Sequence, residues 1–259
     1  CSVNLLVEGI KYQLQAKKRH GIHSPFVFEL STALETIKMD VPSKQALHQL
    51  AKEQKNNHAY FDIEDHGAGS KKREVKRSVS SLYSNSATKG KYGLLLYQLI
   101  NHWQPFSILE LGTSLGVGTL HMHFGNPRAH ITTIEGSKKI ASIAEQTLSQ
   151  FAHEPHRIQV IQSTFKDYFK TDIEASFDFI YIDGHHDGAA LLEYVECLKP
   201  YMHEKTIVLI DDIRWSQSML TAWKTLCMQP YFKVSIDFFR MGCLCIRKHQ
   251  EKEHFTLKF

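Results

Sequence analysis

The sequence lacks any apolar run that could cross a membrane. Its longest apolar runs, such as TIVLI at 206–210, are far shorter than the roughly 20 residues that a membrane-spanning helix needs. Internal repeats and low-complexity segments are also missing. Hydrophobic residues make up 42% and charged residues 22% of the chain, which is typical of globular proteins. These features predict a folded protein without a membrane span and argue against a repeat array or a largely disordered chain.

Cysteine is scarce and does not suggest a disulfide framework. The five cysteines are an odd number, none forms a C-x-x-C motif, and they stand at positions 1, 197, 227, 243 and 245. Reduced thiols in a cytoplasmic protein fit this pattern. Cys243 and Cys245 alternate in one predicted strand, so we interpret them as packing residues. Cys1 could also mark a mature lipoprotein, but a helical pattern follows at once where a polar tether is usual.

The chain has no long basic stripe, although its net charge is +4. The segment KKREVKR at 71–77 carries five positive charges and one negative. We interpret it as a solvated loop or helix face, with a phosphate or nucleic-acid patch as the alternative. No aromatic residues alternate with its charges, as base stacking would require. The N/D-P-P-Y signature of amino-methylating DNA enzymes is absent, so nucleic acid is disfavoured as a partner.

The front of the chain reads as helical. The first predicted helix covers about 2–20 and ends in basic residues, with Gly21 as its stop. Two further helices are predicted from Ser24-Pro25 onward and from Pro42 to about 57, because proline is favoured in a first helical turn. Residues 60–73 read as a loop, and a further helix over 86–103 ends before Pro105. We therefore expect a helical N-terminal extension over 1–85, which could cover a substrate as a lid, and a main domain over 86–259.

The pattern of hydrophobic residues changes at residue 106. Short apolar strands then alternate with amphipathic segments, which predicts right-handed crossovers and a parallel sheet covered on both faces. The last two strands are joined so tightly that they must be antiparallel. The seven predicted strands are FSILEL (106–111), HITTIE (130–135), RIQVIQ (157–162), FDFIYID (177–183), TIVLID (206–211), FKVSIDFFR (232–240) and GCLCIRK (242–248).

The stretch ELGTSLGVG, residues 110–118, contains two signals. Residues 112–116 read as G-x-S-x-G, the nucleophile elbow of a serine hydrolase, and Asp211 and His254 follow Ser114 in the order that such enzymes use. The same stretch also reads as a nucleotide-binding turn between a strand and a helix. The hydrolase interpretation leaves two acids, Glu110 and Glu135, without a role, and no HGGG-like oxyanion segment precedes the strand.

Each predicted strand of the parallel sheet ends in polar residues, and ligands bind beyond these carboxyl ends. Glu135 ends the second strand, where a carboxylate can accept both hydroxyls of a ribose. NAD and S-adenosylmethionine are both candidate cofactors, and Glu110 distinguishes between them. It would repel the pyrophosphate of NAD, which needs a helix N-terminus without competing negative charge, but it suits the cationic methionine end of S-adenosylmethionine. The antiparallel C-terminal pair also favours a methyltransferase sheet.

The ordered set ELGTSLG, IYIDGxH and a later DD resembles the class I S-adenosylmethionine-dependent methyltransferases, and within them the O-methyltransferase-like group. The resemblance covers about 87–248 and implies a Rossmann-like seven-stranded α/β sheet, mostly parallel with an antiparallel C-terminal strand. The flanks HGIHSPFVFEL, DHGAGSKK and KEHFTLKF resemble those of bacterial methyltransferases without a defined substrate, especially from Bacteroidetes. Carried over by motif, the expected cofactor residues are Glu110, Gly112, Thr113, Ser114, Gly116, Glu135, Gly136, Ser163, Thr164, Phe165 and Asp183.

The resemblance also implies catalytic residues. In catechol-type enzymes an Asp after strand 4 and an Asp-Asn or Asp-Asp pair after strand 5 surround Mg²⁺, and the placement of Asp183, Asp211 and Asp212 matches this. Such a site would hold paired substrate oxygens and lower the pKa of a hydroxyl. The alternative is that Asp183 binds cofactor or substrate and that an aspartate caps the next helix. Gly184-His185-His186 departs from the catechol pattern and permits a metal-free mechanism with His186 as base.

The expected function is thus O-methylation of a small molecule by an enzyme that uses S-adenosylmethionine, with Mg²⁺ as an optional cofactor. Two alternatives stay open: an NAD-type dinucleotide oxidoreductase, and a methyltransferase-fold binding protein without activity. The expected partner is a small-molecule methyl acceptor, and a homodimer is compatible with the sequence.

Overall fold

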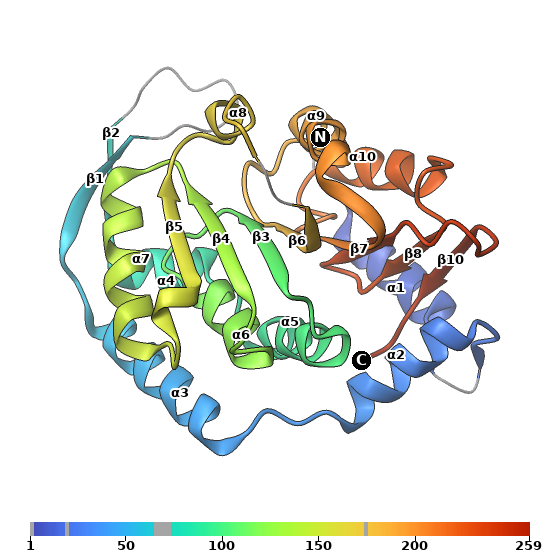
Figure 1. Ribbon diagram of the computed structural model, residues 1–259, viewed down its shortest axis with the longest axis horizontal. Coiled ribbons are helices and arrows are strands. Elements are labelled where there is room, and N and C mark those ends of the chain that lie inside the picture. The colour runs from blue at the N-terminus through green and yellow to red at the C-terminus, as the bar shows by residue number, and fades with distance from the viewer. Residues whose placement is uncertain (1–2, 19–20, 65–73, 174–175) are drawn as a thin grey trace. The chain divides into compact units, whose positions relative to one another are not determined.

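The computed structural model describes residues 3–18, 21–64, 74–173 and 176–259, and Figure 1 shows helices alternating with strands. The helices are α1 Leu5–Gln15, α2 Pro25–Thr36, α3 Val41–Asn56, α4 Val79–Ser86, α5 Gly90–Trp103, α6 Val117–Gly125, α7 Lys138–Phe151, α8 Phe165–Tyr168, α9 Gly188–Leu198 and α10 Gln217–Met228. The strands are β1 Tyr60–Glu64, β2 Glu74–Ser78, β3 Ser107–Leu111, β4 His130–Glu135, β5 Ile158–Gln162, β6 Phe177–Ile182, β7 Met202–Ile210, β8 Val234–Asp237, β9 Gly242–Cys245 and β10 Glu253–Thr256. No helix in these ranges combines the length and the apolarity that a membrane span requires.

The chain forms two compact units, each of which is described separately below. The first unit consists of Cys1–Thr36 and Ile173–Phe259, and the second consists of Ile37–Asp172. The front helices are divided between them, because α1 and α2 belong to the first unit and α3 to the second. The expected extension over 1–85 is therefore distributed over both units.

The second unit contains a parallel sheet in which β4 lies between β3 and β5. Helix α7 packs on β4 and β5, and α6 packs on β4 (Figure 1). Helix α5 presents a buried apolar stripe that includes Leu95, Leu96, Leu99 and Ile100, as the 3.6-residue period of an amphipathic helix predicts. Helices α3 and α4 complete the core of this unit by burying Leu50 and Leu82. The three strands and the helices between them agree with the sequence prediction.

A two-stranded hairpin in the second unit was not predicted. Strands β1 and β2 pair antiparallel, with Tyr60 opposite Ser78 and Asp62 opposite Lys76. The prediction of a loop over 60–73 is therefore wrong for 60–64, and residues 65–73, which include the DHGAGS segment, lie outside the described residues. The basic segment 71–77 was interpreted as a loop or helix face, but its described part belongs to β2. Lys76 and Arg77 are exposed there, so the expected solvation is confirmed.

The first unit contains β6 to β10. Strand β7 pairs parallel with β6 and antiparallel with β9, and β9 also pairs antiparallel with β8. The predicted antiparallel C-terminal pair is thus confirmed. Strand β10, which pairs parallel with β8, is one strand more than predicted. Cys243 and Cys245 are free thiols with no exposed surface, which agrees with their interpretation as packing residues.

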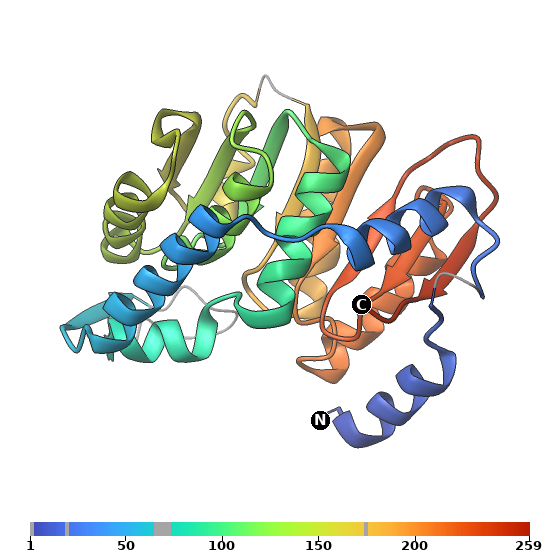
Figure 2. The same cartoon turned by 90° about the horizontal axis from the view of Figure 1, so that it is seen from below.

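The two front helices of the first unit contact its C-terminal segment, from which they are distant in sequence. Tyr12 of α1 donates a hydrogen bond to the carbonyl of Leu257. At α2, the guanidinium of Arg247 lies 4.0 Å from the ring centroid of Phe26, and the amide of Gln250 donates to Ser24 Oγ at 2.9 Å. Figure 2 shows α2 in blue alongside this part of the chain. Side-chain contacts thus attach both helices to the unit.

Candidate cofactor and acceptor sites

A sharp turn connects β3 to α6 in the second unit. Gly112, Ser114 and Gly116 have φ values of 109°, 49° and 79°, in the left-handed region that glycine enters without a steric penalty. Gly116 is the N-cap of α6. The backbone N–H groups of Gly112 and Thr113 donate to the carbonyl of Ile134 at 3.0 and 3.2 Å, which ties the turn to β4. The predicted strand, glycine turn and helix are confirmed.

Glu110 lies at the end of β3 and is only 1% exposed. Its Oε2 accepts hydrogen bonds from the hydroxyls of Thr119 and Thr133 at 2.5 and 2.6 Å. Burial raises the pKa of Glu110 to about 7, against the lowering effect of the two threonine hydrogen bonds, and the nearby charge of Glu135 raises it slightly further. The carboxyl group therefore gains or loses its proton near neutral pH. The sequence did not single out the two threonines, because neither belongs to the motif.

Glu135 lies at the end of β4 and is partly exposed. Its two carboxyl oxygens accept from the backbone N–H groups of Ser114 and Ser137 at 3.0 and 2.9 Å. The acid that the sequence associated with the ribose is thus joined to the glycine turn, a link that only the folded backbone reveals.

The remaining expected cofactor residues of this unit follow β4 and β5. The carbonyl of Gly136 accepts a hydrogen bond from the side chain of Gln162 at 3.1 Å, and the backbone N–H of Ser163 donates to the carbonyl of Glu135 at 3.0 Å. Thr164 is the N-cap of α8, which begins at Phe165. The structure therefore gathers ten of the expected cofactor residues on the strand ends of one unit, and the eleventh, Asp183, belongs to the other unit.

The predicted catalytic histidine lies in the first unit, in the segment after β6. His186 Nε2 is 3.7 Å from Asp212 Oδ2, and its ring centroid is 5.4 Å from that of Trp215. Trp215 is 66% exposed. His185 has a φ of 59° and hydrogen-bonds through Nδ1 to the hydroxyl of Tyr194. His186 is thus placed beside a carboxylate and an exposed aromatic ring.

The acidic pair after β7 is engaged by an arginine that the sequence did not single out. Arg240 Nε donates to Asp211 Oδ1 at 2.8 Å and Arg240 Nη2 donates to Asp211 Oδ2 at 2.6 Å. The hydroxyl of Tyr181 donates to Asp211 Oδ2 at 3.1 Å, and the backbone N–H of Asp212 donates to Asp211 Oδ1 at 2.7 Å. A carboxylate offers about four lone-pair positions, so these four donors saturate Asp211.

Two of the three residues of the expected metal site, Asp211 and Asp212, thus lie against the guanidinium of Arg240. In the described ranges no group of three or more His, Cys, Asp or Glu side chains is arranged to hold a metal ion. Arg240 Nε also lies 3.0 Å from Asp212 Oδ1. Burial and the adjacent Asp211 raise the pKa of Asp212, and Arg240 opposes this effect. The residues present do not fit a divalent ion, because a fixed positive charge already occupies the carboxylates.

The structure does not support the hydrolase interpretation of residues 112–116, because the expected triad partners of Ser114 are engaged elsewhere. His254 Nδ1 is 2.8 Å from Ser235 Oγ, and Asp211 is bound to Arg240. The two residues that would have completed a triad with Ser114 do not form a His–Asp pair. Ser114 instead supplies a backbone N–H to Glu135, as a residue of a cofactor loop would.

Comparisons with known proteins agree with this geometry. Residues 109–213 match the family model described as a methyltransferase domain. The O-methyltransferase hkm8 of Aspergillus hancockii is 32% identical over 131 residues, which are 49% of this chain and 51% of that protein. The chain spans about half the length of the curated relatives it matches.

Solved structures extend the likeness in fold. A methyltransferase of Podospora anserina, PaMTH1, with bound S-adenosylhomocysteine (SAH), aligns with a TM-score of 0.62 at 16% identity. The alignment covers 87% of this chain and 97% of the other. An O-methyltransferase of Bacillus cereus in complex with SAH aligns with a TM-score of 0.56 at 17% identity, over 81% and 93% of the two chains. Residues 109–213 thus resemble a methyltransferase domain, and the fold of the chain is similar to that of solved methyltransferases.

Proposed function

We propose that the protein transfers the methyl group of S-adenosylmethionine to a hydroxyl oxygen of a small molecule. The observation that carries this proposal is the glycine turn of the second unit, with Glu110 buried at its start and Glu135 bonded to its backbone. The matching methyltransferase domain and the O-methyltransferase relatives support the same activity. When bound, S-adenosylmethionine supplies an electrophilic methyl group on a sulfonium.

The residues of the second unit fit this cofactor. An ionised Glu110 at the glycine turn would favour the cationic methionine portion and disfavour a pyrophosphate. Glu135 would accept hydrogen bonds from the ribose hydroxyls, as a carboxylate does at the end of the second strand in this kind of fold. The segment Ser163–Phe165 would border the adenine. Asp183 was expected in the same set, but it belongs to the first unit, after β6.

In the proposed mechanism His186 takes the proton of the acceptor hydroxyl. Methyl transfer is an in-line displacement, so the protein must mainly align the two reactants and provide a deprotonated acceptor. Asp212, 3.7 Å from Nε2 of His186, would orient the imidazole for this step. Trp215 offers an exposed aromatic face beside His186, which suits an acceptor whose hydroxyl is carried by an aromatic ring.

Titration calorimetry with S-adenosylhomocysteine tests the cofactor assignment. Glu135→Ala removes charge-assisted hydrogen bonds and should weaken binding by about 2–3 kcal/mol, which is roughly a 30- to 150-fold loss of affinity. The matched control is Glu145→Ala, because Glu145 is exposed on α7 and its loss should leave the affinity unchanged.

The same titration separates the alternatives. Binding of NAD in place of S-adenosylhomocysteine would overturn the proposal in favour of an oxidoreductase. Binding of S-adenosylhomocysteine without turnover of S-adenosylmethionine on any hydroxyl acceptor would leave a binding protein with a methyltransferase fold.

A further inference from the structure

Two consecutive aspartates, Asp211 and Asp212, directly follow β7, and both carboxylates contact a single guanidinium. Asp211 is 1% exposed, and neighbouring carboxylates of this kind repel each other unless a cation or hydrogen bonds offset their charge. We infer that Arg240 is a built-in cation that takes the place of a divalent metal ion at the end of β7 and that holds Asp212 in position for His186. The part that concerns His186 rests on the proposed function, whereas the part that concerns the ion does not.

The sheet explains why Arg240 reaches this position. Strand β9 pairs antiparallel with β7, and Gly242 lies opposite Ile210. If this register is continued beyond the strands, the residue two before Gly242 faces the residue two after Ile210, and these residues are Arg240 and Asp212. The backbone follows the same course, because the N–H of Ile213 donates to the carbonyl of Arg240 at 2.9 Å.

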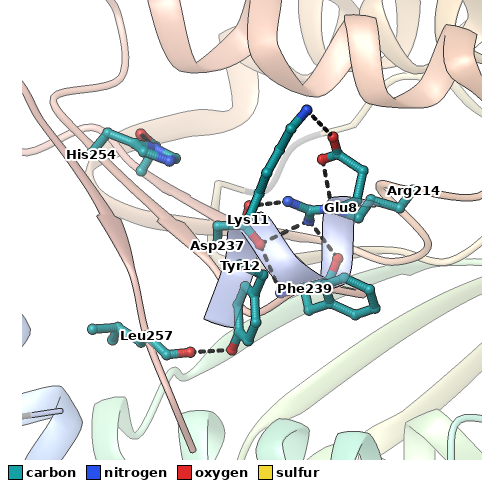
Figure 3. A network of polar contacts seen from close by, with 9 residues as sticks. Glu8, Lys11, Tyr12, Arg214, Asp237, Phe239, His254 and Leu257 are labelled. Carbon is teal, nitrogen blue, oxygen red and sulfur yellow. Dashed lines mark hydrogen bonds and ion pairs between the residues drawn. The ribbon is translucent and has the colours of Figure 1, made fainter. Parts of the chain in front are cut away.

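A second arginine also connects the segment after β7 to the end of β8. Here the arginine comes from the segment after β7 and the aspartate from β8. Arg214, from the loop after β7, donates through Nη1 and Nη2 to the carboxyl oxygens of Asp237 at 2.9 and 2.7 Å. It also donates to the carbonyl of Phe239 at 2.6 Å, directly before Arg240. Figure 3 shows this network together with Glu8 of α1, which pairs with Arg214. The loop that carries Arg240 is thus held by contacts independent of Asp211.

The geometry leaves little room for exchange with a metal ion. A divalent ion would have to displace the two guanidinium hydrogen bonds of Asp211 and then lie beside the positive charge of Arg240, which it would repel. Arg240 also lies 3.0 Å from Asp212, whose second oxygen lies 3.7 Å from His186. Arg240 is therefore a positioning residue that acts on the histidine through Asp212.

Manganese binding, followed by the electron paramagnetic resonance signal of free Mn²⁺, tests the inference without cofactor or acceptor. We expect the unaltered protein to bind no Mn²⁺ up to about 1 mM, the weak end of binding by oxygen ligands. Arg240→Ala should expose the two carboxylates and create one Mn²⁺ site. Its affinity should be at least roughly tenfold higher than the limit of about 1 mM for the unaltered protein. Arg240→Gln keeps a side chain of similar length without the charge, and it should gain the site as well.

Two further variants separate charge from structure. Arg240→Lys retains the positive charge and should continue to exclude Mn²⁺. Arg247→Ala removes an arginine of the same unit that lies over Phe26, and it should gain no site. Stoichiometric Mn²⁺ binding by the unaltered protein would overturn the inference, as would the absence of a gained site in a folded Arg240→Ala or Arg240→Gln variant. Failure of the proposed methyltransferase function would change neither result.

Discussion

Arg214 and Asp237 form a two-pronged ion pair in which the guanidinium side chain is 9% and the carboxylate side chain 7% exposed. The pair joins the loop after β7 to the end of β8, and Arg240 joins the loop after β8 back to Asp211. Arg214 of the loop after β7 thus pairs with the last residue of β8, and Arg240 of the loop after β8 pairs with Asp211. Such reciprocal pairing fixes the relative position of the two loops more firmly than either pair could alone.

The first prediction concerns Asp237→Asn. The variant keeps the volume of the side chain but leaves the buried charge of Arg214 without its main partner, although Glu8 stays at 3.5 Å. Breaking a buried ion pair by removing one member costs roughly 3–5 kcal/mol. We expect the free energy of unfolding to fall by about 3 kcal/mol, measured by urea denaturation with circular dichroism.

Glu196→Ala is the matched control for this measurement. Glu196 pairs with Lys199 at 2.6 Å on the surface of the same unit, and exposed pairs contribute about 0–1 kcal/mol. If Asp237→Asn and Glu196→Ala lowered the free energy of unfolding equally, the buried pair would contribute no more than the exposed pair, and the prediction would be wrong.

Much of the sheet could be predicted because its strands are apolar and buried. HITTIE begins and ends with a polar residue, FDFIYI lies between Ser176 and Asp183, and the positions of β4 and β6 follow from these patterns. The hairpin of β1 and β2 was missed because EVKRS is polar and charged, so its pairing depends on cross-strand contacts and not on an apolar face. Strand β10 was missed because only four residues form it and three of them are polar.

The site shows the same limit. The glycine turn and Glu135 could be predicted because their motif is local in sequence. The bond between Arg240 and Asp211 joins residues 29 positions apart, and it depends on the register of β9 against β7. No local pattern marks Arg240, so the sequence could not indicate that a guanidinium lies against Asp211 and Asp212.

The second prediction concerns the pH dependence of cofactor binding. The pKa of Glu110 is raised to about 7, chiefly by burial, so its carboxyl group is largely neutral below pH 7 and ionised above it. If the ionised form favours the ammonium group that S-adenosylhomocysteine shares with S-adenosylmethionine, affinity for S-adenosylhomocysteine should rise as pH increases from 6 to 8. Below pH 7, binding should release a proton, because the ligand stabilises the carboxylate. Calorimetry in buffers of different ionisation enthalpy measures both effects.

The control for this prediction is Glu110→Gln, which imitates the neutral carboxyl group. Its affinity should be low and nearly constant between pH 6 and 8, with no proton release. A pH dependence equal to that of the unaltered protein would assign the proton to another group.

The last prediction decides between base and metal catalysis. With labelled S-adenosylmethionine and a panel of catechol and other phenolic acceptors, EDTA should leave turnover unchanged, because Arg240 already neutralises the carboxylates. His186→Ala should lower kcat by roughly 10²- to 10⁴-fold, the usual contribution of a general base, and added imidazole should restore part of it. The control is His203→Ala, since His203 forms a similar pair with Asp178 at 3.0 Å in the same unit and should be dispensable. Turnover that EDTA abolishes, Mg²⁺ restores and His186→Ala spares would rule out the histidine as base and would require an ion to displace Arg240.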